Sequence, residues 1–324
     1  MPTEHQRFSS KEVIHRDSMD RIQQVAVIIP FFNEIHKLER AIRSLLKQTH
    51  LPHRIILVDD CGTEKFNDDI LEEIRAYGID PLLLRNKANK GPGGSRQAGM
   101  ENITGETDFL LFLDSDDYLS ENFIAESLRI HSKRPDIIAT FGNTVNIETG
   151  FNRIQTTPAD VSSLLEGLLY GRLWGTGTIL WRYDLIREIQ WTSLKSIEDS
   201  HFEFSAAKIN PRIAYVPDAI LFIEQSLNID RLRKRNRLQP WNSDRPMKFD
   251  LFNKMLHEFP FKPADKDDRK HLKYTCYHWV HFADYSALKC LLKMIGFLFK
   301  GKPLVCLQLI MFYPKYLRLT RAGE

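Results

Sequence analysis

Residues 109–117 read FLLFLDSDD, in which five apolar side chains are followed by three carboxylates within four positions. An apolar block without alternation is typical of a strand that helices cover on both faces, as in a parallel sheet. The carboxylates would lie at the carboxyl end of that strand, and open α/β sheets bind their ligands at this edge. The stretch therefore predicts an α/β fold with acidic side chains beside a ligand.

Carboxylates this close together repel one another unless a cation neutralises them. Mg²⁺ and Mn²⁺ prefer oxygen ligands, commonly one or two protein carboxylates together with water and substrate phosphates. The acidic run therefore predicts a divalent cation and a metal-bound diphosphate. One alternative stays open here: Asp114, Ser115 and Asp117 would instead form a turn and cap the helix expected near residue 121.

Strand and helix patterns alternate along the chain before the acidic run. Apolar strands are expected at 25–29, 54–58 and 82–84, and amphipathic helices at 35–46 and 66–77. This alternation predicts a parallel sheet with right-handed crossovers. After the acidic run, further strands are expected at 137–141, 144–147, 179–181 and 219–224, and helices at 161–170 and 202–208.

A glycine-rich segment, NKGPGGSRQAG at residues 89–99, follows the third expected strand. Its glycines permit a close approach of backbone to a ligand, and Arg96 offers a fork of donors suited to phosphate. The segment fits neither GxGxxG nor the P-loop pattern, and a flexible turn has the same composition. Similarly, Glu198 and Asp199 fit either a functional acid pair or plain capping of the helix that follows them.

The length of 324 residues and the 43% hydrophobic content allow a full core, and we expect one large domain with an appendage. Four cysteines without a CxxC pair favour a reducing compartment. Residues 1–24 form a polar tail without the apolar core of a signal peptide. We therefore expect a cytoplasmic protein.

Residues 228–324 are strongly basic, with 20 Lys and Arg against 9 Asp and Glu. Two apolar segments, 287–299 and 304–313, are each shorter than the ~20 residues that span a bilayer. We expect a basic, mostly helical C-terminal appendage that contacts an anionic membrane surface. The alternative is a buried helix pair that closes the main domain or makes a dimer contact.

Taken together, residues from about 25 to about 226 resemble the family 2 glycosyltransferases, which are nucleotide-sugar-dependent enzymes. The stretches that carry the resemblance occur in the family's order: VIIPFFNE at 27–34, ILVDD at 56–60, the segment 89–99, LDSDD at 113–117 and ED at 198–199. Gln97 departs from the family pattern NxGxxxxRNxG, which has Asn there. The resemblance implies the GT-A fold, a Rossmann-like α/β architecture with a mixed, mainly parallel sheet flanked by helices.

The resemblance also implies roles for individual residues. Asp199 is expected to be the catalytic base, and Asp116 the ligand of Mg²⁺ or Mn²⁺. Residues expected to bind the nucleotide sugar are Pro30 and Phe32 at the uracil, Asp60 at the base, Arg96 near the diphosphate, Asp114 near the ribose, and Asn33, Glu34, Gly91 and Ser115. Acceptor binding is expected at Trp174, Gly175 and Glu198. Many relatives carry a His or Arg after the strand 219–224, but this chain reads EQSLN at 224–228, which leaves Arg231 or Arg233 for the diphosphate.

By this resemblance, 25–227 is the catalytic domain, with a nucleotide-binding half at about 25–117 and an acceptor half at about 118–227. The expected activity is inverting transfer of a sugar, of the hexosyl type, from a UDP-sugar to a glycan or lipid-linked acceptor. The expected setting is bacterial surface polysaccharide synthesis at the inner face of the membrane. Nucleic-acid binding is not expected, because the basic residues form no known binding module.

Two other functions stay open. The first is a sugar-phosphate nucleotidyltransferase, which would be expected to carry a glycine-rich loop with a basic residue where PFFN stands at 30–33. The second is a nonenzymatic protein that binds nucleotide sugars, against which the acid at position 199 argues.

Overall fold

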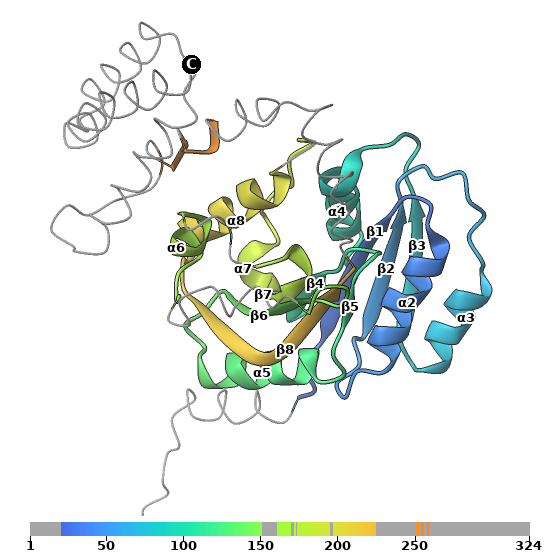
Figure 1. Ribbon diagram of the computed structural model, residues 1–324, viewed down its shortest axis with the longest axis horizontal. Helices are drawn as coiled ribbons and strands as arrows, with labels where there is room; N and C mark the ends of the chain where they lie inside the picture. The colour runs from blue at the N-terminus through green and yellow to red at the C-terminus, as the bar shows by residue number, and fades with distance from the viewer. Residues whose placement is uncertain are drawn as a thin grey trace, which may run out of the picture.

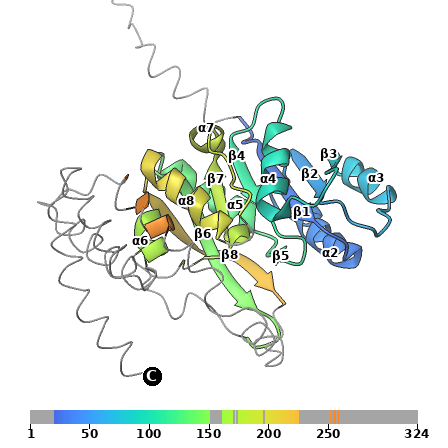
Figure 2. The ribbon, with the colours of Figure 1, turned by 90° about the horizontal axis from the view of Figure 1, so that it is seen from above.

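The computed structural model describes residues 21–150, 161–169, 172, 174–194, 197–224, 250–252, 254, 255 and 258. These residues form an eight-stranded sheet in the order β3-β2-β1-β4-β7-β6-β8-β5, with helices on both faces (Figure 1). Figure 2 gives a second view of the same layers. The predicted fold class, a mixed and mainly parallel α/β sheet flanked by helices, is confirmed.

The first four strands all run parallel to one another. They are β1 (Val25–Phe31), β2 (Arg54–Asp59), β3 (Asp80–Arg85) and β4 (Phe109–Phe112). β1 pairs with both β2 and β4. Parallel strands end at the same edge of a sheet, so the acids that follow β2 and β4 are carried to one edge.

The other four strands add antiparallel pairs. They are β5 (Tyr118–Leu119), β6 (Ala139–Asn146), β7 (Ile179–Arg182) and β8 (Ile213–Ile223). β7 runs antiparallel to β4 and β6, whereas β6 and β8 are parallel. The expectation of two strands at 137–141 and 144–147 was wrong, because the chain continues through an irregularity at Gly142 as one strand. A Cβ at Gly142 would lie 2.2 Å from the carbonyl oxygen of Ala219.

Successive residues of β1 enter two different cores, as strand geometry requires. Val25, Val27 and Ile29 pack in the core that includes α2 (Ile35–Leu46), α3 (Asp69–Ala76) and α5 (Phe123–Lys133). Ala26 and Ile28 pack in the opposite core. That second core includes residues of α4 (Gly91–Glu101), α6 (Leu164–Leu169), α7 (Tyr183–Ile186) and α8 (Glu198–Ile209).

The glycine-rich segment is not a loop, because residues 91–101 form α4. A Cβ at Gly93 would lie 2.4 Å from the carbonyl oxygen of Thr192, and one at Gly99 would lie 2.6 Å from Cγ2 of Ile28. These two glycines therefore let α4 approach β1 and the segment before α8. In the structure they serve protein packing rather than an approach to ligand.

The structure describes little of the basic appendage. Leu251, Phe252 and Met255 are buried, and Lys208 of α8 forms an ion pair with Glu258 at 2.5 Å. The run 231–237 and both apolar segments after residue 286 lie outside the described residues. Among the helices that are described, none combines the length and the apolar character needed to cross a bilayer. Membrane contact by this region stays a prediction.

His131 links α5 to β7 and makes the fold sensitive to acid. Its ring centroid lies 4.6 Å from that of Phe109, and its Nε2 lies 3.1 Å from the carbonyl oxygen of Leu180. Burial lowers the pKa of His131 to about 4 from an ordinary value of 6.5. Below pH ~6.5 the unfolded chain therefore binds a proton that the folded chain excludes, and stability is lost as the pH falls towards ~4.

Replacing His131 by Gln is expected to remove most of this acid sensitivity. The effect should amount to about 3 kcal/mol, the free energy of moving a pKa from about 6.5 to about 4. Urea denaturation of both proteins at pH ~7.5 and pH ~4 measures it. An equal loss of stability on acidification in the two proteins would contradict the assignment.

Candidate active site

The acidic run, residues 114–117, follows shortly after β4. Asp117 donates its backbone N–H to the carbonyl oxygen of Asp114 at 3.1 Å, which makes a tight turn. Desolvation, followed by the charge of Asp114, raises the pKa of Asp116. Desolvation and the charges of Asp114 and Asp116 raise the pKa of Asp117 to about 9. This crowding of carboxylates fits a hard divalent cation, which would relieve the repulsion.

Among the described residues, no group of three or more His, Cys, Asp and Glu side chains has the arrangement of a metal site. Mg²⁺ beside a substrate diphosphate commonly takes only one or two protein carboxylates, and Asp116 is a carboxylate of that kind.

Arg40 of α2 holds the backbone of this turn. Its Nη2 donates to the carbonyl oxygen of Asp116 at 2.8 Å, and its guanidinium lies 4.9 Å from the ring centroid of Tyr118. It also forms an ion pair with Glu224, the residue after β8. The sequence interpretation missed Arg40, because a charged residue on the polar face of an amphipathic helix carries no distinguishing signal.

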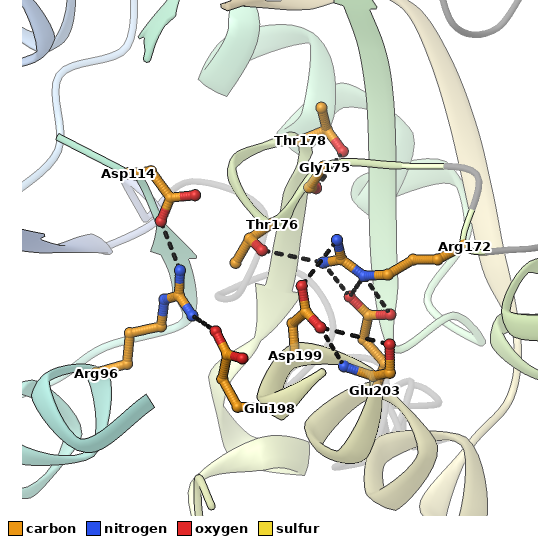
Figure 3. Close-up of polar contacts among 10 residues, drawn as sticks. Arg96, Asp114, Arg172, Gly175, Thr176, Thr178, Glu198, Asp199 and Glu203 are labelled. Carbon is orange, nitrogen blue, oxygen red and sulfur yellow. Dashed lines mark hydrogen bonds and ion pairs between the residues drawn. The ribbon is translucent and has the colours of Figure 1, made fainter. Parts of the chain in front are cut away.

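Arg96 joins the acidic turn to the first turn of α8. Its Nη2 donates to Oδ1 of Asp114 at 2.5 Å, and its Nη1 donates to Oε1 of Glu198 at 3.3 Å (Figure 3). The guanidinium is buried, 4.8 Å from the ring centroid of Trp191. Desolvation and the charge of Asp199 raise the pKa of Glu198, whereas Arg96 opposes that rise. In the structure both terminal nitrogens of Arg96 are therefore occupied by carboxylates.

Asp199 lies beside Glu198 but pairs with a different arginine. Its Oδ2 is 2.9 Å from Nη1 of Arg172, and its Oδ1 accepts the backbone N–H of Ser200 at 2.7 Å. The side chain is 21% exposed, which leaves it open to a substrate. Arg172 also contacts Glu203, one helical turn further along α8 (Figure 3).

The sequence interpretation missed Arg172 and Glu203. A weak signal was present, because acids at positions 199 and 203 lie four residues apart on one helix face and repel each other unless a cation lies nearby.

The predicted acids are brought together. Arg96 bridges Asp114 and Glu198 directly, and Asp199 is the next residue on α8. The charge of Asp114 also helps to raise the pKa of Arg172, the partner of Asp199. Carboxylates from β4 and from α8 therefore face one region at the edge of the sheet.

Asp60 is buried, and its carboxylate accepts hydrogen bonds from the start of α4. Its Oδ1 accepts bonds from Nδ2 of Asn86 and from the backbone N–H of Lys90, both at 2.8 Å. Its Oδ2 accepts the backbone N–H of Gly91 at 2.8 Å. Both carboxylate oxygens are thus engaged within the protein, and any contact with a nucleotide base would use their remaining lone pairs.

The turn after β1 is fixed by Asn33. Its Oδ1 accepts bonds from the backbone N–H groups of residues 63 and 64 at 2.7 and 3.0 Å. Asn33 and Glu34 both have left-handed backbones, with φ of 56° and 54°. Phe32 is 50% exposed, whereas Pro30 is buried. Phe32 therefore offers an accessible aromatic surface for a nucleotide base.

The residues expected at the acceptor differ in exposure. Trp174 is fully buried in the second core, where its ring lies 5.1 Å from that of Phe141. Its side chain has no face for an acceptor, so the expected role of Trp174 is replaced by a packing role. A Cβ at Gly175 would lie 3.3 Å from Cδ2 of Leu221. Ser115, which is expected at the nucleotide sugar rather than at the acceptor, is half-buried beside the acids.

A mixed α/β sheet with acids after a central parallel strand, faced by a second acid pair on a helix, is the arrangement expected of a glycosyltransferase of the GT-A fold. The chain belongs to glycosyl transferase family 2, whose family model matches residues 26–194, slightly more than half of its length.

Two curated relatives illustrate the family. Over 201 residues, the chain is 26% identical to an uncharacterized glycosyltransferase of Haemophilus influenzae, covering 61% of this chain and 78% of that protein. Over 95 residues, it is 32% identical to the succinoglycan biosynthesis protein ExoW of Rhizobium meliloti, covering 29% and 28% of the two chains.

Among solved structures, the fold is similar to that of residues 1–349 of S. aureus TarS in complex with UDP-GlcNAc. The TM-score is 0.55 at 18% identity, and the match covers 93% of each chain. Against a longer TarS chain the match covers only 54% of that chain. This likeness concerns the fold.

Proposed function

We propose that the protein is an inverting glycosyltransferase that takes a sugar from a UDP-sugar and adds it to a glycan or lipid-linked acceptor. The observation that carries the proposal is the linkage of Asp114 to the first turn of α8 through Arg96. Through Arg96, the acids after β4, which would bind a cation and a diphosphate, lie close to Asp199, which would take a proton from a hydroxyl.

On the donor side, the turn after β1 and the acidic turn form the proposed nucleotide-sugar site. Phe32 would contact the uracil, with Pro30, Asn33 and Glu34 supporting it, and Asp60 and Gly91 would flank the base. Arg96 would orient Asp114 towards the ribose, with Ser115 beside it. Asp116 would hold Mg²⁺ or Mn²⁺, which when bound stabilises the extra negative charge of the departing nucleoside diphosphate.

On the acceptor side, Asp199 would act as the general base. A sugar hydroxyl is a poor nucleophile at neutral pH, so a carboxylate that takes its proton during attack accelerates the reaction. Attack from the face opposite the diphosphate inverts the anomeric carbon and gives a β-glycoside from an α-linked donor. Glu198 and Gly175 would lie along the approach of the acceptor.

The pathway is also proposed. The similarity to ExoW, whose name refers to succinoglycan biosynthesis, supports a role in building a bacterial polysaccharide. The excess of Lys and Arg in residues 228–324 supports a position at the inner face of the plasma membrane, against anionic lipids.

A screen of UDP-sugars tests the function. With Mn²⁺ present, one UDP-sugar is expected to be hydrolysed slowly to UDP without an acceptor, and UDP is expected to raise the melting temperature of the protein. Formation of a UDP-sugar from UTP and a sugar phosphate would instead favour a nucleotidyltransferase. Binding of UDP-sugars with no turnover towards any glycan acceptor would favour a nonenzymatic binding protein.

A further inference from the structure

Arg172 is the centre of a second charged group beside the acids already described. Its guanidinium makes three contacts with the carboxylate of Glu203, at 2.7, 3.0 and 3.1 Å. It makes one contact with Asp199 at 2.9 Å and one with Oγ1 of Thr176 at 3.0 Å. Figure 3 shows Asp199 and Glu203 directed at the same guanidinium from one face of α8.

The backbone of Arg172 is held in an uncommon conformation. Its φ is 60°, in the left-handed region that residues with a side chain seldom adopt. Its backbone N–H donates to the carbonyl oxygen of Gly167 at 2.9 Å. The surrounding chain therefore fixes the direction from which the guanidinium reaches α8.

The guanidinium of Arg172 makes more contacts with Glu203 than with Asp199. Glu203 is buried, and desolvation raises its pKa to about 7 although Arg172 opposes the rise. Burial alone would lower the pKa of Arg172, but the charges of Glu203 and then Asp199 raise it. The guanidinium therefore lies between two carboxylates, with three contacts to the buried Glu203 and one to the more accessible Asp199.

The contacts with Glu203 affect how Asp199 could act as a base. A fully unpaired guanidinium beside Asp199 would favour its charged form and oppose the uptake of a proton. Because Glu203 neutralises the guanidinium, the single contact to Oδ2 can orient the Asp199 carboxylate at a smaller electrostatic cost. The bond from Ser200 fixes the other oxygen, and further lone pairs stay free to accept a proton.

We propose that Arg172 is a positioning residue that orients the Asp199 carboxylate towards the acceptor hydroxyl, and that Glu203 serves as the neutralising partner of Arg172. The inference rests on the proposed function, because it assumes that Asp199 is the base. In the proposed site Arg172 does not contact the donor, so donor affinity should not depend on Arg172.

The test compares four changes: Arg172→Gln, Arg172→Lys, Arg172→Ala and the double change Arg172→Gln with Glu203→Gln. The double variant avoids leaving a buried carboxylate without its counter-charge, and keeps the test valid if the single Gln variant does not fold. A misplaced catalytic group commonly costs about 100-fold in rate. We therefore expect kcat to fall about 10- to 100-fold in both Gln variants, with donor KM and UDP affinity changing less than about twofold.

Two further readouts separate positioning from general structural support. Arg172→Lys keeps the charge without the planar fork, so it should recover only part of kcat. Millimolar guanidinium added to Arg172→Ala should restore part of the rate, because the free ion can occupy the space between Asp199 and Glu203. Arg182→Gln is the matched control, since Arg182 pairs with Asp184 away from the site, and its kcat should be unchanged.

The results separate the positioning role of Arg172 from the base role of Asp199. If the double variant keeps wild-type kcat, or if UDP affinity falls in proportion to kcat, Arg172 does not act as a positioning residue. If Asp199→Asn is itself fully active, the base assignment fails rather than the positioning role alone. Loss of activity in Asp199→Asn together with full activity in all Arg172 variants would overturn this inference and leave the proposed function standing.

Discussion

Asp199→Asn is expected to lose ~10² to 10⁴ in kcat, the usual contribution of a positioned general base. The amide keeps the size of the carboxylate and can still accept the bond from Arg172, but it cannot take up the acceptor's proton. UDP affinity should stay at the wild-type value, because Asp199 lies on the acceptor side of the proposed site. Steady-state kinetics with the identified donor, together with calorimetric titration of UDP, measures both quantities.

Asp184→Asn is a suitable control for this change. Asp184 pairs with Arg182 and is largely exposed, so the same acid-to-amide exchange should leave kcat within about twofold of wild type. Near-normal turnover in Asp199→Asn would show that another group removes the proton.

Asp116→Ala is expected to abolish the effect of Mn²⁺ on UDP binding. Groups that only support a metal ligand already cost 10- to 100-fold in metal affinity when they are removed, so loss of a ligand should cost at least about 100-fold. The measurement is UDP affinity with and without Mn²⁺, in both proteins. Wild type and variant should bind UDP similarly without the metal, and only wild type should gain affinity when it is added.

A matched change addresses the fold of the variant. Asp184→Ala makes the same acid-to-alanine exchange at a largely exposed residue outside the proposed site, and its response to Mn²⁺ should resemble that of wild type. Unchanged UDP affinity of Asp116→Ala in the presence of Mn²⁺ would remove Asp116 from the metal site.

The sequence predicted those parts of the fold in which local pattern and tertiary environment agree. The apolar runs at 25–29, 54–58 and 109–113 are buried on both faces of a parallel sheet, so their composition alone indicated strands. The helix at 35–46 was found with its bounds, because its apolar residues recur on one face. The acids after β4 stood out because they follow one of these apolar runs, whereas those at the start of α8 were assigned a role by the family resemblance.

Elements that depend on distant contacts could not be predicted in this way. The glycines of α4 oppose helix formation locally, yet the helix forms where Gly93 and Gly99 pack closely against residues far along the chain. The join at Gly142 depends on β8, which is some seventy residues away in sequence. Arg172 stands in no recognisable sequence motif, and only the folded chain shows that it meets two acids of α8.

The first turn of α8 gives adjacent side chains to different arginines, Glu198 to Arg96 and Asp199 to Arg172. Because the two pairs share no side chain, an engineer can alter one and leave the other intact. A change at Arg172 would then slow transfer to the acceptor and leave donor binding beside Arg96 unaltered.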